Sequence, residues 1–248
     1  MFNFESEKNY TMGKENKKYH MAHFKPWEGA CYKHGIIGFN KNGHIVYGTE
    51  DNPGIKILVL GDSHYCAKPE DDKSSLTNDI IRDLLNPSSE HESYKNTYTK
   101  FIKSLTGYYD ILTNDQKQDA WEHIMFYNYV QTPMSAARIA PTSDDYRDSD
   151  DAFLGVLKES DADLVIAWGK RLYNNLPQDG EQGEDLEILD GDYEGEAIEV
   201  WRYKVKQGTE NKWVPVIGIC HPSAAFVIEY WGALICAFIE RTIIQKGE

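Results

Sequence analysis

Four short apolar runs stand out along the chain, each long enough for one buried β-strand. The run at residues 55–60 (IKILVL) is almost continuously apolar, which is typical of a strand covered on both faces. Comparable runs occur at residues 124–130, 163–169 and 214–219. We interpret these four runs as the strands of a central sheet.

The segments between these runs show helical periodicity. Residues 74–86 place leucines and isoleucines on one side, and the Asn86-Pro87 pair ends the segment. Further helices are predicted at residues 94–105, 115–124, 150–160, 170–176 and 224–244. Because strands alternate with helices, we expect the α/β class: a three-layer α/β/α fold with a central, mostly parallel sheet.

Two β-hairpins are predicted in addition to this sheet. The runs at 36–39 and 44–47 flank an Asn-Gly turn signal, and those at 198–205 and 213–219 flank residues 206–208. Residues 1–30 are polar and Lys-rich, with interspersed aromatics. We therefore expect a single domain, in which residues 1–50 form an arm and hairpin packed on an α/β unit of residues 51–248.

Composition and charge narrow the function classes. The 248 residues are 41% hydrophobic, which is enough for a large core, and they carry a net charge of −14. This charge argues against nucleic-acid binding through bulk positive charge, but a local basic groove stays possible. Residues 179–196 contain nine acidic and no basic side chains, which predicts a solvated loop.

The sequence predicts a cytoplasmic protein without a membrane span. It has no apolar run of the roughly 18 residues that a span needs, and its N-terminal segment lacks the pattern of a secretory signal. The four cysteines and eight histidines show no spacing typical of a zinc site, so we expect no metal, no other cofactor and reduced thiols.

Polar groups follow three of the predicted strands, at Gly61–Cys66, Asn128 and His221-Pro222-Ser223. The carboxyl ends of parallel strands meet at one edge of a sheet, so we expect these groups to share a crevice. Asp62 fits a general base, a water-holding group or a turn residue. His221 fits a donor to a developing oxyanion or a core histidine.

Asn128 is unusual because its strand is otherwise apolar and aromatic. Its carboxamide both donates and accepts hydrogen bonds, so it fits a reader of a nucleobase edge, or a structural bond to the backbone. Ser63 fits a nucleophile or a helix cap, and Tyr65 fits a stacking platform or a packed wall residue.

The order of these strand ends resembles the uracil-DNA glycosylase superfamily, from about Ile55 to Phe226. The first block resembles the family's strand ending in a glycine turn, the Asn128 strand resembles its base-reading strand, and the His221 block resembles its final motif. The matching segments are residues 57–65, 125–128, 138–142, 163–171 and 216–223. The proline common in the first turn is replaced here by His64.

The resemblance implies hydrolysis of the N-glycosidic bond of a uracil-type base that is flipped out of DNA. Asn128 would bind the Watson–Crick edge of the base, and His221 would stabilise charge on its carbonyl oxygen. The first turn would place the water. The implied residues are Asp62, Ser63 and His221 for catalysis, and Asn128, Tyr65, Gly61 and Ser223 for base binding. The implied partner is DNA with a uracil or damaged base.

Two other functions stay open. The block Val59–Ser63 also resembles the Gly-Asp-Ser motif of SGNH/GDSL esterases, with Ser63 as nucleophile and His221 as base. The aspartate that this family carries three residues before its histidine is Gly218 here. A non-catalytic binding protein, which would use the acidic loop and the aromatic arm, is the third possibility. The sequence does not determine the oligomeric state.

Overall fold

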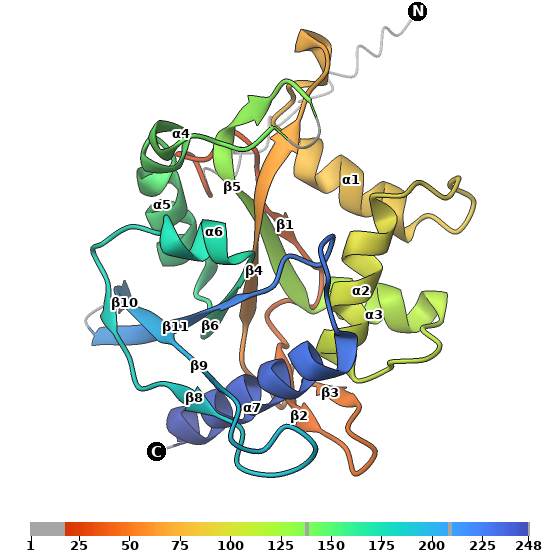
Figure 1. Ribbon diagram of the computed structural model, residues 1–248, viewed down its shortest axis with the longest axis vertical. Helices are drawn as coiled ribbons and strands as arrows, with labels where there is room; N and C mark the ends of the chain where they lie inside the picture. The colour runs from red at the N-terminus through yellow and green to blue at the C-terminus, as the bar shows by residue number, and fades with distance from the viewer. Residues whose placement is uncertain (1–17, 137–138, 208–209, 248) are drawn as a thin grey trace, which may run out of the picture.

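The computed structural model describes residues 18–136, 139–207 and 210–247, so most of the predicted N-terminal arm lies outside the described residues. Its centre is a seven-stranded sheet in the order β1-β5-β4-β6-β11-β10-β7 (Figure 1). The strands are β1 (Trp27–Glu28), β4 (Ile57–Tyr65), β5 (Ile124–Met134), β6 (Leu164–Trp168), β7 (Glu181–Gln182), β10 (Val200–Gln207) and β11 (Glu210–Ile219).

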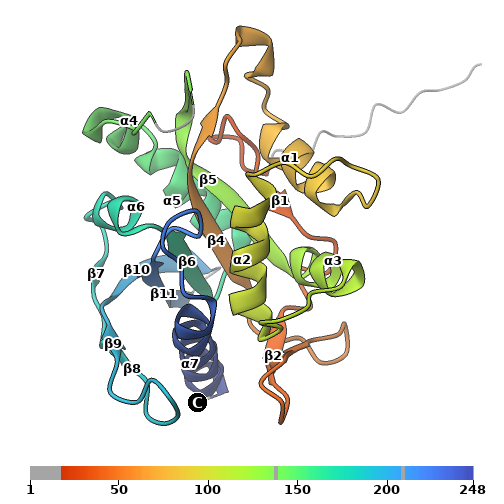
Figure 2. The same ribbon diagram turned by 45° about the vertical axis from the view of Figure 1, so that its right-hand side comes forward.

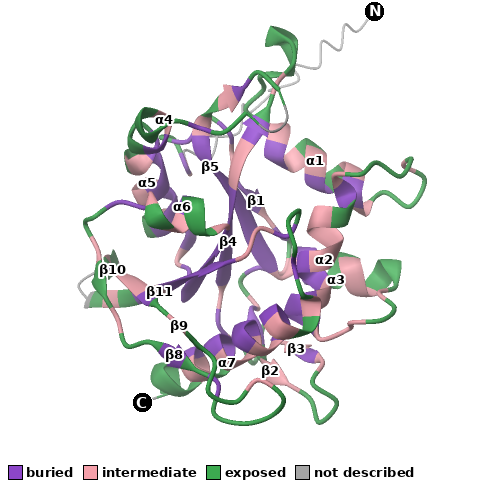
Figure 3. Cartoon of the chain, viewed as in Figure 1, coloured by how far each residue is buried: buried purple, intermediate pink, exposed green. Residues whose placement is uncertain are grey.

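The four middle strands of this sheet, β5, β4, β6 and β11, run parallel to one another. The remaining three strands extend the two edges in antiparallel pairs. The middle strands are the four apolar runs of the sequence, and they are buried along most of their length (Figure 3). The prediction of a mostly parallel central sheet is confirmed.

Helices cover both faces of the sheet (Figure 2). On one face, α1 (Leu76–Leu85), α2 (Lys95–Thr106), α3 (Asn114–Glu122) and α7 (Ile228–Gly247) pack on alternate strand residues that include Val59 and Phe126. On the other, α4 (Ser143–Arg147), α5 (Asp150–Ser160) and α6 (Lys170–Asn174) pack on residues that include Leu58 and Tyr127. This alternation follows from the two-residue period of a strand, and it produces the predicted three-layer fold.

Both predicted hairpins are present. The first consists of β2 (Ile36–Phe39) and β3 (Ile45–Tyr47), which form a sheet of their own, and Gly43 in its turn has a φ of +75°. The second is the β10–β11 pair, which also forms one side of the central sheet. Its turn at residues 208–209 lies outside the described part of the chain.

Three predictions need correction. The first buried strand does not end at Gly61, because the backbone of β4 continues to pair with β5 as far as Tyr65. Residues 179–196 are not wholly a solvated loop: Leu186 is buried, and β8 (Leu186–Glu187) pairs with β9 (Ala197–Ile198). The last helix begins at Ile228 rather than residue 224, because the chain first turns after His221.

No helix in the described part of the chain combines the length and the apolar character that crossing a bilayer requires.

Candidate active site

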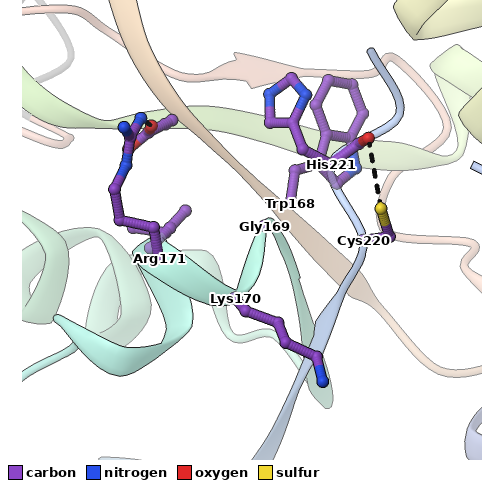
Figure 4. A pocket seen from close by; sticks show the side chains of 8 residues that line it. Trp168, Gly169, Lys170, Arg171, Cys220 and His221 are labelled. Atoms are coloured by element: carbon purple, nitrogen blue, oxygen red, sulfur yellow. Dashed lines mark hydrogen bonds and ion pairs between the residues drawn. The ribbon is translucent and has the colours of Figure 1, made fainter. Parts of the chain in front are cut away.

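A cavity of about 340 Å³ lies at the carboxyl edge of the sheet, where β6 and β11 end and where β4 contributes Asp62. Its volume is within the range of small-molecule sites. Segments distant in the sequence line it together, and Figure 4 shows their side chains. The lining residues are Asp62, Trp168, Gly169, Lys170, Arg171, Leu172, Cys220 and His221.

Asp62 is held by two side chains from the helices on its face of the sheet. The Tyr146 hydroxyl of α4 donates to Asp62 Oδ1 at 2.6 Å, and the Arg171 guanidinium of α6 forms an ion pair with Oδ2. Arg171 Nε also donates to the Tyr146 oxygen at 3.0 Å. Burial, reinforced by Asp62, raises the pKa of Tyr146, so the phenol stays protonated and donates. An anchored carboxylate of this kind suits charge stabilisation and positioning better than strong base catalysis.

His221 is the second residue after β11, and its ring has a defined tautomer. The backbone N–H of Ser223 donates to Nδ1 at 3.2 Å, and the Ser223 hydroxyl lies 2.8 Å from the same nitrogen. A backbone N–H only donates, so Nδ1 is the acceptor and Nε2 carries the proton. Burial lowers the pKa of His221, which favours the neutral ring. Within the described part of the chain, Nε2–H has no hydrogen-bond partner and is available to a ligand.

The indole of Trp168 forms one wall beside this imidazole, with the two rings 6.0 Å apart and nearly perpendicular. In Figure 4, His221 and Arg171 point to the same side of the chain, whereas Lys170 points away from both. The cavity therefore has an aromatic wall next to a neutral donor and a paired carboxylate.

Asn128 lies on β5 and is not among the residues that line the cavity. It is paired in register with Gly61 and is 4% exposed. Its Nδ2 lies 2.9 Å from Nε2 of His64, a buried ring that also contacts Thr77 Oγ1 at 2.8 Å. The carboxamide therefore belongs to a buried polar cluster of Asn128, His64 and Thr77, and its base-binding role stays a prediction.

The other predicted residues have different surroundings. Ser63 follows Asp62 on β4, so its side chain points to the opposite face of the strand, and no hydrogen bond joins it to His221 among the described contacts. Tyr65 is 52% exposed. Ser223 contacts His221, and its backbone N–H donates to Nδ1, which makes Nδ1 the acceptor of the ring. Gly61 lies against Asn128, where a Cβ would collide with the amide oxygen.

Neither the family models nor the curated proteins compared with the chain match it.

Sequence reasoning did not assign roles to Tyr146, Arg171 or Trp168. Trp168 and Arg171 stand at the end of the third predicted strand, so their place at the carboxyl edge was readable from the sequence. Tyr146 had no such signal, because it lies in a short helix between strands and reaches Asp62 only through the tertiary fold.

Proposed function

We propose that the chain is a DNA N-glycosylase that hydrolyses the bond between deoxyribose and a uracil-type base. The observation that carries the proposal is one cavity lined by both His221, a neutral donor, and Asp62, an anchored carboxylate. These are two of the three residues to which the resemblance to uracil-DNA glycosylases assigns catalysis; the third, Ser63, does not line the cavity.

The reaction breaks the bond between C1′ of the sugar and the ring nitrogen of the base. The bonding electrons leave with the base and place negative charge on its carbonyl oxygen, while the sugar becomes oxocarbenium-like. Nε2–H of His221 donates to that oxygen, and the Asp62 carboxylate stabilises the cationic sugar and orients water. Water supplies hydroxide to C1′ and a proton to the base.

The anchoring of Asp62 suits this role. A dissociative transition state needs a fixed negative charge near the sugar more than it needs a strong base. Tyr146 and Arg171 hold the carboxylate in place before substrate arrives.

The esterase alternative is less well supported. It needs an unprotonated Nε2 on His221 to accept the proton of the Ser63 hydroxyl, but Nδ1 already accepts from the backbone N–H of Ser223, so Nε2 carries the ring proton. Since Ser63 points away from the face of Asp62, the geometry favours glycosidic hydrolysis.

The test uses single- and double-stranded oligonucleotides that contain one uracil. Base release is measured by chromatography for the wild-type chain, for His221→Gln, and for His91→Gln, an exposed histidine that serves as the matched control. We expect His221→Gln to lower the rate by about 100- to 1,000-fold and the control to leave it unchanged. Failure to release uracil from any of the oligonucleotides would refute the proposal.

The pH profile of the wild-type reaction gives a second readout. The neutral form of His221 is the donor, and burial lowers its pKa, so the neutral form persists as the pH falls below 6.5. The rate should therefore stay level through that pH and decline only in more acidic buffer. Labelling of Ser63 by a fluorophosphonate, without base release, would instead favour the esterase.

A further inference from the structure

Cys31, His34 and His123 come together at the amino-terminal edge of the sheet, at the opposite ends of the strands from the cavity. One ligand atom from each side chain lies within 4.8 Å of the others, and all three residues are half-buried. The sequence did not indicate a metal site, because the third residue is far along the chain from the first two.

The backbone holds these three residues in place. The N–H of Cys31 donates to the Glu122 carbonyl at 2.8 Å, which docks the first segment beside His123. The N–H of His34 donates to the Cys31 carbonyl at 2.9 Å, so a tight turn presents both side chains together. His123 caps the C-terminus of α3 and directly precedes β5. The cluster therefore results from main-chain pairing between two segments, and not from an accidental approach of long side chains.

The orientation of His123 is that of a metal-bound histidine. Its Nδ1–H donates to the Asp119 carbonyl at 2.7 Å, which leaves the lone pair of Nε2 for a ligand bond. The ring of Tyr47 stacks on the imidazole with centroids 4.2 Å apart. Hydrogen bonding of one ring nitrogen to a carbonyl is the usual way in which proteins fix a ligating imidazole.

We propose that Cys31, His34 and His123 bind a zinc ion that joins the segment before β2 to the end of α3. One thiolate with two imidazoles favours Zn²⁺ over Mg²⁺ and Ca²⁺, which prefer oxygen ligands. Tetrahedral zinc separates such donor atoms by about 3.3–3.6 Å, so modest side-chain rotations complete the site. Water occupies the fourth position. The site lies at the far edge of the sheet from Asp62 and His221, so it is separate from the proposed active site.

The test measures metal binding by the full chain after chelator treatment. Co²⁺ serves as the spectroscopic probe, because a thiolate ligand gives a charge-transfer band and tetrahedral geometry gives intense visible bands. We expect one Co²⁺ per chain, displaced by Zn²⁺. Cys31→Ser and His123→Gln should each weaken Zn²⁺ binding by more than about 100-fold, while the controls Cys66→Ser and His91→Gln should not.

A stability measurement keeps the test informative if one variant folds poorly. Zn²⁺ should raise the melting temperature of the wild-type chain and not that of His34→Gln, whose fold is checked by circular dichroism without metal. A wild-type chain that shows no thiolate charge-transfer band would overturn the proposal. So would Co²⁺ binding that is equally strong in Cys31→Ser.

Discussion

His64 offers the sharpest quantitative test of the structure. The ring is 3% exposed, with Nε2 close to Asn128 Nδ2 and Thr77 Oγ1, and the edge of Phe24 packs against it. Burial, with a smaller contribution from His23, lowers the pKa of His64 from 6.5 to about 3. An amide nitrogen only donates, and Asn128 Nδ2 lies 2.9 Å from Nε2 and 3.3 Å from Nδ1, so the contact requires that one of the two ring nitrogens is unprotonated.

This shift makes stability depend on pH with a definite sign. Between pH 6.5 and about 3 the unfolded chain binds a proton at His64 that the folded chain does not. The stability that the fold has while the His64 ring is neutral is therefore fully present above pH 6.5, and it is lost progressively as the pH falls toward about 3. Each pH unit inside the window removes about 1.4 kcal/mol, so a change from about pH 7.5 to about pH 5.0 removes roughly 2 kcal/mol of unfolding free energy.

The assay is urea denaturation at both pH values, with His64→Gln as the perturbation. Glutamine keeps polar atoms near Asn128 and Thr77 but does not titrate. All other groups contribute equally to the pH dependence of the unfolding free energy in the two chains, so the difference between them comes from His64. We expect wild type to lose about 2 kcal/mol more than His64→Gln. An exposed control, His91→Gln, should follow wild type. Equal losses in wild type and His64→Gln would refute the burial of a neutral ring at this position.

Two further predictions concern stability alone and are read from urea denaturation at neutral pH. Gly61→Ala should destabilise the fold by about 1–3 kcal/mol, because the new methyl group collides with the Asn128 amide and the Phe126 ring; an unchanged midpoint would contradict that packing. Thr113→Ala should cost about 1 kcal/mol, because Thr113 and Gln116 form a capping box at α3. Ser75 at α1 makes no capping hydrogen bond, so Ser75→Ala should cost clearly less.

The architecture was largely readable from the sequence, for a physical reason. A strand covered on both faces must be apolar at consecutive positions, and Ile57–Leu60 satisfies this. The extension of the same strand through Asp62 and Ser63 was not readable. The polar side chains at these positions predict a loop, but the backbone continues to pair with β5. That pairing depends on the partner strand and not on local composition.

Individual contacts in the site were less predictable than its location. That Asp62 follows a buried strand is a local fact, but its bonds to Tyr146 and Arg171 depend on where α4 and α6 pack. The same holds for the proposed zinc ligands. Cys31 and His34 share one turn, but their approach to His123 depends on strand β1 docking beside β5.

The cluster of Asn128, His64 and Thr77 connects the stability of the fold with the proposed specificity for uracil. Because Nδ2 of Asn128 donates to the neutral His64, the carboxamide cannot rotate freely, and its Oδ1 is directed to the Gly61 side. A free carbonyl oxygen accepts a hydrogen bond from the N3–H of uracil, whereas N3 of cytosine is itself an acceptor and is repelled. Within the proposed function, a buried histidine that never reaches the base would therefore fix the orientation of the asparagine to which the resemblance assigns base reading, although that carboxamide lies outside the lining of the cavity.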